Sequence, residues 1–274
     1  MHIGCHAVLF KDAISTDTVN VLQSLHDAGA EGAEIGARFF GIGRVSELNQ
    51  ALKKTDMKMS GMHVSPLLVG YLDNFEECRK TVLSVAEFVS HTECSNIIMT
   101  GGVDWKAPDY GDARLQNKEF MVEVAKKINE LAIEIKEKYG IQINYHNHNW
   151  EFLNDGLIFN ALVENAPDLH FALDVGWASV AGFAPIELIQ NLAGRINYIH
   201  LRDYRKKDIN GLVSFVDFQN CFVSLGEGDI DFRTLLDVFR KTAGNDSWAV
   251  VEYEVGDVDA VRYKRAVDYV KSLL

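Results

Sequence analysis

Short apolar runs of strand length alternate along the whole chain with longer segments whose apolar residues recur at helical spacing. In the run that begins at Ile141, the residues Ile141, Ile143 and Tyr145 occupy every second position, which is the period of a half-buried strand. Seven further runs predict strands at residues 2–10, 31–36, 58–64, 95–100, 169–175, 196–202 and 248–254. The pattern therefore predicts eight strands.

A helix is predicted after each of these strands. The longest, Leu115–Tyr139, carries an apolar stripe at helical spacing and ends before Gly140, a residue suited to a helix C-terminus. Asp155 and Asp231 are predicted to cap the starts of two later helices. The predicted helices span residues 16–28, 46–54, 74–91, 115–139, 156–165, 185–192, 231–240 and 258–274.

The regular alternation of strands and helices predicts the fold. Strands that each lead into a helix must run parallel, and eight such units close into a (β/α)8 TIM barrel of the α/β class. No linker divides the chain, so one domain spanning residues 1–274 is expected. The alternative is a doubly wound open sheet, which usually has a glycine-rich turn after its first strand. This chain has none there, and Gly226–Asp229 lies in a late loop.

Charge and composition narrow the classes of partner. The 274 residues carry 39 acidic and 27 basic side chains, and a net charge of −12 argues against nucleic acid or an anionic membrane as a partner. The short basic cluster Arg205–Lys207 is either a solvated loop or a contact for a substrate phosphate. The four cysteines are not spaced as a metal or redox motif, and the chain starts without a signal-peptide pattern, so a cytoplasmic setting is expected. A homo-oligomer is compatible with this composition.

Polar residues capable of binding a metal stand at the ends of the predicted strands, where TIM barrels carry their active sites. These residues are Glu34, His63, His146, His148, Asp174, His200 and Glu252. Each one alone could be a cap or a hydrogen-bonded turn residue. Together they would bring costly unpaired charges to one barrel mouth, and a divalent cation would remove that cost. The pattern therefore predicts a metal site.

Several short motifs in this order resemble the sugar isomerase/epimerase family with a xylose-isomerase-like barrel. The matching segments are Ser60–His63, Tyr145–His148, Leu173–Asp174, Ile199–Asp203, Leu225–Gly228 and Val251–Glu252. The resemblance covers essentially the whole chain. The group also contains endonuclease-IV-type barrels and inosose and dehydroshikimate dehydratases.

The resemblance implies that Asp174, His200 and Glu252 are metal ligands. The family usually supplies a fourth ligand from a glutamate on strand 5, whereas this chain has His146 there. In sugar epimerases of this type the strand-5 and strand-8 glutamates also carry protons, so one carrier is replaced. Glu252 and His146 are accordingly the expected catalytic residues. Trp177 stands where many relatives have a histidine near the substrate.

The expected chemistry begins with removal of a proton next to a carbonyl. A metal that binds a ketone oxygen and the adjacent hydroxyl would stabilise a cis-enediolate. Reprotonation would make the protein an isomerase or epimerase of a sugar or sugar phosphate. Loss of a substituent would make it a dehydratase or lyase acting on a keto-sugar or keto-cyclitol, and this alternative stays open. A phosphodiesterase is disfavoured by the charge, and a sugar-binding protein without turnover is a further alternative.

Two histidines and two carboxylates favour one Mn, Co, Zn or Fe ion over Mg, which prefers oxygen ligands. The expected substrate is a small carbohydrate. Its expected contacts, all at strand ends or just beyond them, are Glu34, His63, His148, Trp177 and Arg202. Alternatives are a structural role for Glu34, core packing for Trp177 and an ion pair of Arg202 with Asp203 or Glu227. The loop 203–231 is long enough to be a lid.

Overall fold

Eight parallel strands form a closed barrel in the computed structural model, which describes residues 1–212, 214–258 and 260–274. The order around the barrel is β1, β10, β7, β6, β5, β4, β3 and β2. The barrel strands are β1 His2–His6, β2 Gly32–Gly36, β3 Lys58–Val64, β4 Asn96–Thr100, β5 Gln142–His146, β6 His170–Asp174, β7 Ile196–Leu201 and β10 Trp248–Val251. The barrel is closed by pairing of β1 with β10, in which His2 lies opposite Trp248. The predicted (β/α)8 barrel is therefore confirmed.

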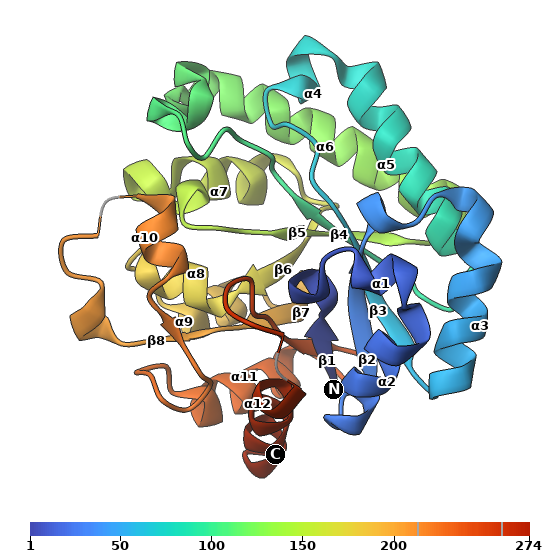
Figure 1. Cartoon of the computed structure of the whole chain (residues 1–274). Coiled ribbons are helices and arrows are strands. Elements are labelled where there is room, and N and C mark those ends of the chain that lie inside the picture. Colours follow the sequence, from blue (N-terminus) through green and yellow to red (C-terminus); the bar gives the residue numbers. More distant parts are fainter. Residues whose placement is uncertain (213, 259) are drawn as a thin grey trace.

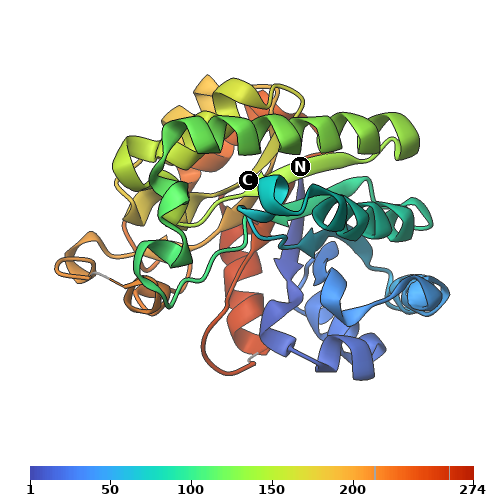
Figure 2. The same ribbon diagram turned by 90° about the horizontal axis from the view of Figure 1, so that it is seen from above.

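Helices surround the barrel, as Figures 1 and 2 show, with the long α6 along one side. The helices are α1 Ala13–Thr16, α2 Thr18–Asp27, α3 Val45–Thr55, α4 Gly70–Asp73, α5 Phe75–Ser90, α6 Lys118–Tyr139, α7 Leu153–Asn165, α8 Val175–Val180, α9 Pro185–Asn191, α10 Phe215–Gln219, α11 Phe232–Ala243 and α12 Ala260–Ser272. Among the described residues, none of these helices is both long and apolar enough to cross a bilayer.

Local signals explain where several helices begin and end. The carboxylate of Asp231 accepts a hydrogen bond from the Thr234 amide at 3.1 Å, as its predicted capping role requires. Gly140 has a φ of 71° at the end of α6. The predicted cap at Asp155 is wrong, because Asn154, Asp155 and Gly156 all have left-handed backbone angles within a kink of α7.

Several elements of the second half were not predicted. The strand that ends at Asp174 leads directly into the short helix α8. The loop 203–231 contains the antiparallel pair β8 Asp203–Tyr204 and β9 Phe222–Val223, with α10 between them. In Figures 1 and 2 this segment, drawn in orange, projects at the rim of the molecule. The loop that was expected to be a lid thus contains a short helix and has a two-stranded sheet at its base.

Side chains from alternating strand positions fill the barrel interior. Ile98, Ala172, Tyr198, Trp248 and Val250 form a buried cluster there. A Cβ atom at Gly32 would lie 2.6 Å from the Trp248 ring, so the indole occupies the space that this glycine leaves. Residues one strand period further along point inward just above this cluster, toward the carboxyl ends of the strands. This arrangement brings polar residues of different strands to one level.

Candidate metal centre and cavity

Four of the predicted residues meet at that level. His146 from β5, Asp174 from β6, His200 from β7 and Glu252 just after β10 offer donor atoms that all lie within 4.8 Å of one another. We call these residues the quartet. Each is at most 2% exposed. The strand register explains the meeting, since Asp174 lies directly opposite His200 in the β6–β7 pair.

The donor atoms of the quartet converge without satisfying one another. Nδ1 of His146 lies 2.6 Å from Nδ1 of His200, so one of the two nitrogens must carry a proton if no cation lies between them. Oε2 of Glu252 is 3.9 Å from His200 Nδ1 and has no hydrogen-bond partner among the described residues. A buried, unpaired carboxylate oxygen is costly. Two imidazoles and two carboxylates with this arrangement fit a divalent ion such as Zn or Mn.

The far side of His200 is held by a second carboxylate. Nε2 of His200 lies 2.6 Å from Oε2 of Glu34, which also accepts a hydrogen bond of 2.8 Å from the Tyr198 hydroxyl. Metal-binding histidines are commonly oriented in this way. Burial works to lower the pKa of His200, but the carboxylates of Glu34 and Glu252 raise it to about 9. Glu34, predicted to contact substrate, lies at 0% exposure beside His200.

Arg202 neutralises part of the quartet's charge. Its Nε donates to Asp174 at 2.7 Å, and its Nη2 lies 3.0 Å from Glu252 and 3.1 Å from Glu254. The alternative role of Arg202, an ion pair, is found with Asp174, Glu252 and Glu254 as partners in place of Asp203 or Glu227. Burial raises the pKa of Asp174 to about 6, whereas the pKa of Glu252 lies well below its usual value because Arg202 and His6 overcome the effect of burial.

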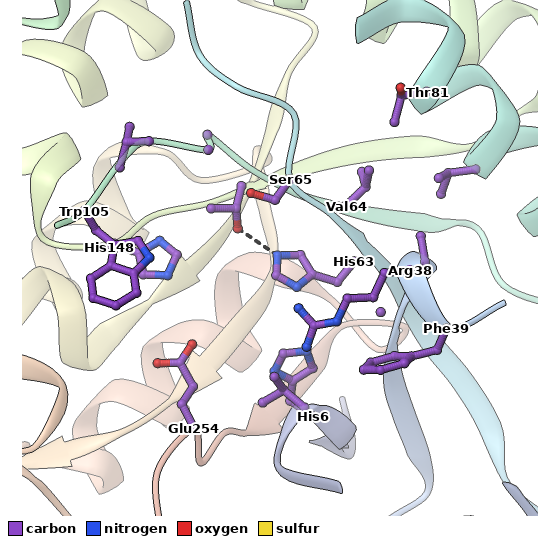
Figure 3. Close-up of a pocket in the computed structure, with 18 of the residues that line it drawn as sticks. His6, Arg38, Phe39, His63, Val64, Ser65, Thr81, Trp105, His148 and Glu254 are labelled. Carbon is purple, nitrogen blue, oxygen red and sulfur yellow. Dashed lines mark hydrogen bonds between the residues drawn. The ribbon is translucent and has the colours of Figure 1, made fainter. Parts of the chain in front are cut away.

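A cavity of about 670 Å³ opens beside the quartet. None of the quartet residues lines it, but His6, Arg38, His63, Trp105, His148 and Glu254 do, and Figure 3 shows these side chains. Arg202 and Trp177 are not among the lining residues either. The quartet therefore borders the cavity through His6 and His148 without lining it, and the lining side chains are the first that a substrate would meet.

His148 is the cavity residue with the most distinctive surroundings. Its ring stacks on Trp150 at a centroid distance of 4.1 Å and meets the His146 ring edge-on at 4.8 Å. Its Nδ1 has no hydrogen-bond partner among the described residues. Burial, followed by the charge of Arg202, holds the pKa of His148 well below its usual value, so the ring is neutral near pH 7. Its backbone amide donates to Glu151 at 2.7 Å.

Trp177 belongs to an aromatic cluster around this side of the cavity. It stacks on Phe215 of α10 at 5.0 Å and is fully buried. Phe215 itself lines the cavity together with Trp105 and Trp150. The aromatic surface open to a ligand is therefore made by these residues.

His6 and Glu254 are two of the cavity residues that were missed from the sequence. His6 ends β1, but the predicted strand ran on to Phe10, whereas residues Ala7–Phe10 form a 3-10 helix. The apolar run hid the strand end. Glu254 lies two positions after Glu252, and this period-two spacing, already visible for Tyr198, His200 and Arg202, is the signal that could have identified it.

The comparisons with known proteins agree with this architecture. Residues 22–273 match the family described as a xylose isomerase-like TIM barrel. An inosose dehydratase from Geobacillus kaustophilus is 28% identical over 272 residues, covering 89% of this chain and 86% of the relative. The 3-keto-D-glucoside 4-epimerase YcjR from E. coli has a TM-score of 0.75 at 14% identity, covering 99% of each chain. An IolI protein with a zinc atom has a TM-score of 0.67 at 16% identity, covering 100% of this chain and 96% of the other. The chain belongs to the xylose isomerase-like TIM barrel family.

Proposed function

We propose that this protein is a metal-dependent dehydratase that removes water from a keto-sugar or keto-cyclitol. The observation that carries the proposal is His148, which lines the cavity, has a buried Nδ1 without a hydrogen-bond partner among the described residues, and meets the ring of the quartet residue His146. The 28% identical relative is an inosose dehydratase, which supports a keto-cyclitol as the substrate class.

The quartet would hold the metal ion. Such an ion would polarise a ketone oxygen and acidify the adjacent C–H bond. Arg202 would keep the carboxylates of Asp174 and Glu252 ionised and in place, and Glu34 would orient His200 through its 2.6 Å contact. Glu252 and His146 were expected to move protons, but both are buried behind the cavity wall. We therefore assign them to ion binding.

A single residue, His148, can carry out both proton transfers that dehydration requires. A neutral imidazole takes the proton from the carbon next to the ketone, and the C–H electron pair passes into the enolate. The electron pair then returns to form a carbon–carbon double bond as the C–O bond to the β-hydroxyl breaks. His148 gives its proton to the departing hydroxyl, which leaves as water. The imidazole ends neutral, and the product is the unsaturated ketone.

Glu254 and the aromatic residues would position the substrate. Glu254 lines the cavity and is itself held by Arg202 at 3.1 Å and Gln219 at 3.2 Å, so its carboxylate can accept hydrogen bonds from substrate hydroxyls. Trp105 and Phe215 offer flat apolar surfaces in the same cavity, which suit the C–H face of a sugar or cyclitol ring.

The test is product analysis. Protein loaded with Mn, Co or Zn is incubated in deuterated water with an inosose and with a panel of keto-sugars, and the products are followed by mass spectrometry and ultraviolet absorbance. A conjugated product lighter than the substrate by one water supports the proposal. A product of unchanged formula with deuterium on carbon would contradict it.

That second outcome would support an isomerase or epimerase instead. The observation in favour of this candidate is that two histidines flank His146. The ring of His63 lies 5.9 Å from His146 and the ring of His148 lies 4.8 Å from it. Figure 3 shows His63 and His148 in different parts of the cavity wall. Two separate proton carriers are what inversion of a carbon requires, because one removes the proton and the other returns it.

A further inference from the structure

We propose that a second divalent cation binds to His6, Glu34 and His63, which makes the centre binuclear. These residues come from β1, β2 and β3, and we call them the triad. Their donor atoms lie within 4.8 Å of one another. The proposal concerns ion binding and holds whether the protein is a dehydratase or an epimerase.

The geometry of the triad is close to that of a bound ion. Nε2 of His6 lies 3.5 Å from Oε1 of Glu34, and the His6 and His63 ring centroids are 5.5 Å apart. An ion with bonds of about 2.1 Å holds tetrahedrally arranged donors about 3.4 Å apart. The His6–Glu34 pair already has this spacing, and a small movement of the His63 ring completes the set. Figure 3 shows both rings at the same end of the cavity.

Each triad residue has one atom engaged and one atom free. His6 uses Nδ1 toward Glu252 at 2.6 Å, and His63 uses Nε2 toward Thr100 at 2.8 Å. Glu34 uses Oε2 toward His200 and Tyr198, while its Oε1 is buried without a hydrogen-bond partner among the described residues. Partners on the far atoms of metal ligands fix the direction of the near atoms. The free Nε2 of His6 and the free Oε1 of Glu34 face each other at 3.5 Å.

The charge balance accommodates a second ion. The connected ion pairs around His200 contain four carboxylates, those of Glu34, Asp174, Glu252 and Glu254, and the guanidinium of Arg202. These groups sum to −3 with neutral histidines. One divalent ion leaves −1 and two leave +1, which is the charge that favours an enolate or another substrate anion in the cavity.

The triad is also better placed than the quartet to meet a substrate. His6 and His63 line the cavity, whereas none of the quartet residues does. The two groups are joined, because His6 contacts Glu252 and Glu34 contacts His200. In two-metal enzymes, ions bound side by side share a substrate between them. A cation in the triad would be the one that a substrate oxygen reaches first.

The experiment counts metal ions in the whole protein. Wild type is saturated with Mn, freed of excess metal and measured by elemental analysis and by electron paramagnetic resonance. We expect two Mn per chain and a spin-coupled spectrum. His63→Asn should hold one Mn with an uncoupled spectrum, and Asp174→Ala should lose the quartet ion instead. His91→Asn, at an exposed position far from the cavity, is the matched control and should behave as wild type.

One Mn per saturated wild-type chain, or two retained in His63→Asn, would overturn the proposal. In that case His6 is an imidazolium, held between Glu252 and Glu34 by charge alone. If His63→Asn unfolds, as circular dichroism would show, His6→Asn serves as the second variant with the same expected loss of one ion. Because the readout is ion count and spin coupling, it is independent of whether any tested substrate turns over.

Discussion

The two halves of the barrel mouth treat the same kinds of side chain in opposite ways. In the half formed by β5, β6, β7 and β10, His200 has Glu34 on one ring nitrogen and Glu252 near the other, and its pKa is raised to about 9. In the half formed by β1 to β3, His63 has the hydroxyl of Thr100 as its partner, and burial lowers its pKa to about 4. The two histidines thus differ because carboxylates surround His200, whereas the hydrogen-bond partner of His63 is a hydroxyl. The quartet half holds a charged imidazole at His200, whereas His63 in the other half presents a neutral imidazole to the cavity.

The largest effect should come from removing a carboxylate of the quartet. Asp174→Ala is expected to lower turnover about a thousandfold or more and to abolish binding of the quartet ion, since Asp174 is both a donor and the partner of Arg202. Elemental analysis and a rate assay would measure both. Asp246→Ala, at an exposed acidic position, is the control. Full metal content in Asp174→Ala would show that the quartet is not the storage site for the ion.

A substitution in the cavity wall should separate proton transfer from ion binding. His148→Gln is expected to lower kcat about 10²–10⁴-fold, the range for loss of a general acid–base group, while the metal content stays at the wild-type level. The ratio of kcat to metal content would be compared with that of wild type and of Asn210→Ala, a substitution at an exposed loop position away from the lining residues. Loss of metal in His148→Gln would show that His148 takes part in ion binding, which would contradict its assignment to proton transfer.

Breaking the charge balance of the quartet half should destabilise the metal-free protein. Arg202→Met leaves Asp174 and Glu252 buried without their cation, which is expected to lower the free energy of unfolding by about 3–5 kcal/mol. Urea titration in the presence of a chelator measures this change, and added metal should recover part of it. The control is Arg205→Met, because Arg205 is 39% exposed and pairs with Glu227 at 3.6 Å. Equal effects of the two substitutions would refute the assigned role of Arg202.

The smallest expected effect concerns pH. Burial raises the pKa of Glu151 to about 7, above the 4.5 of an unfolded glutamate. The folded protein therefore keeps this proton to a higher pH, and the stability that it contributes is lost as the pH rises through 7. Between pH 5 and pH 8 the free energy of unfolding of wild type should fall by up to about 3 kcal/mol more than that of Glu151→Gln. Urea midpoints at both pH values measure the difference, with the exposed Glu164→Gln as control. A larger fall in the free energy of unfolding of Glu151→Gln than of wild type would contradict the raised pKa of Glu151.

The sequence predicted the barrel and the set of residues that meet in the quartet half, for a definite physical reason. Strand period and strand order fix which residues point inward at the carboxyl ends, and both can be read from apolar patterning. The end of β1 was misjudged because residues Ala7–Phe10 are apolar and short, and such a run has the same pattern in a strand as in a 3-10 turn. His6, and with it the triad, was hidden by this ambiguity.

The partner of Arg202 could not be predicted in the same way. The sequence offered Asp203, the next residue, and Glu227, in the following loop, as partners. The guanidinium points inward instead, because residue 202 continues the inward face of Tyr198 and His200. Asp203 consequently points to the other side, where it meets the loop. Choices of this kind depend on packing across strands that a single sequence does not display. The ion-binding and substrate-binding roles assigned to individual residues stay predictions until metal content and product are measured.

The buried carboxylate of Asp203 fixes the base of the loop 203–231. Its carboxylate accepts hydrogen bonds from the backbone amides of Tyr204, Gly226, Gly228 and Ile230, at 2.9 to 3.3 Å. A Cβ at Gly228 would lie 2.1 Å from this carboxylate, so this set of hydrogen bonds requires glycine at position 228. These hydrogen bonds hold the two ends of the loop 203–231 together. The middle of the loop contains Phe215, which lines the cavity. Substitutions in the middle of this loop can therefore change the wall of the cavity while the residues of the barrel stay the same.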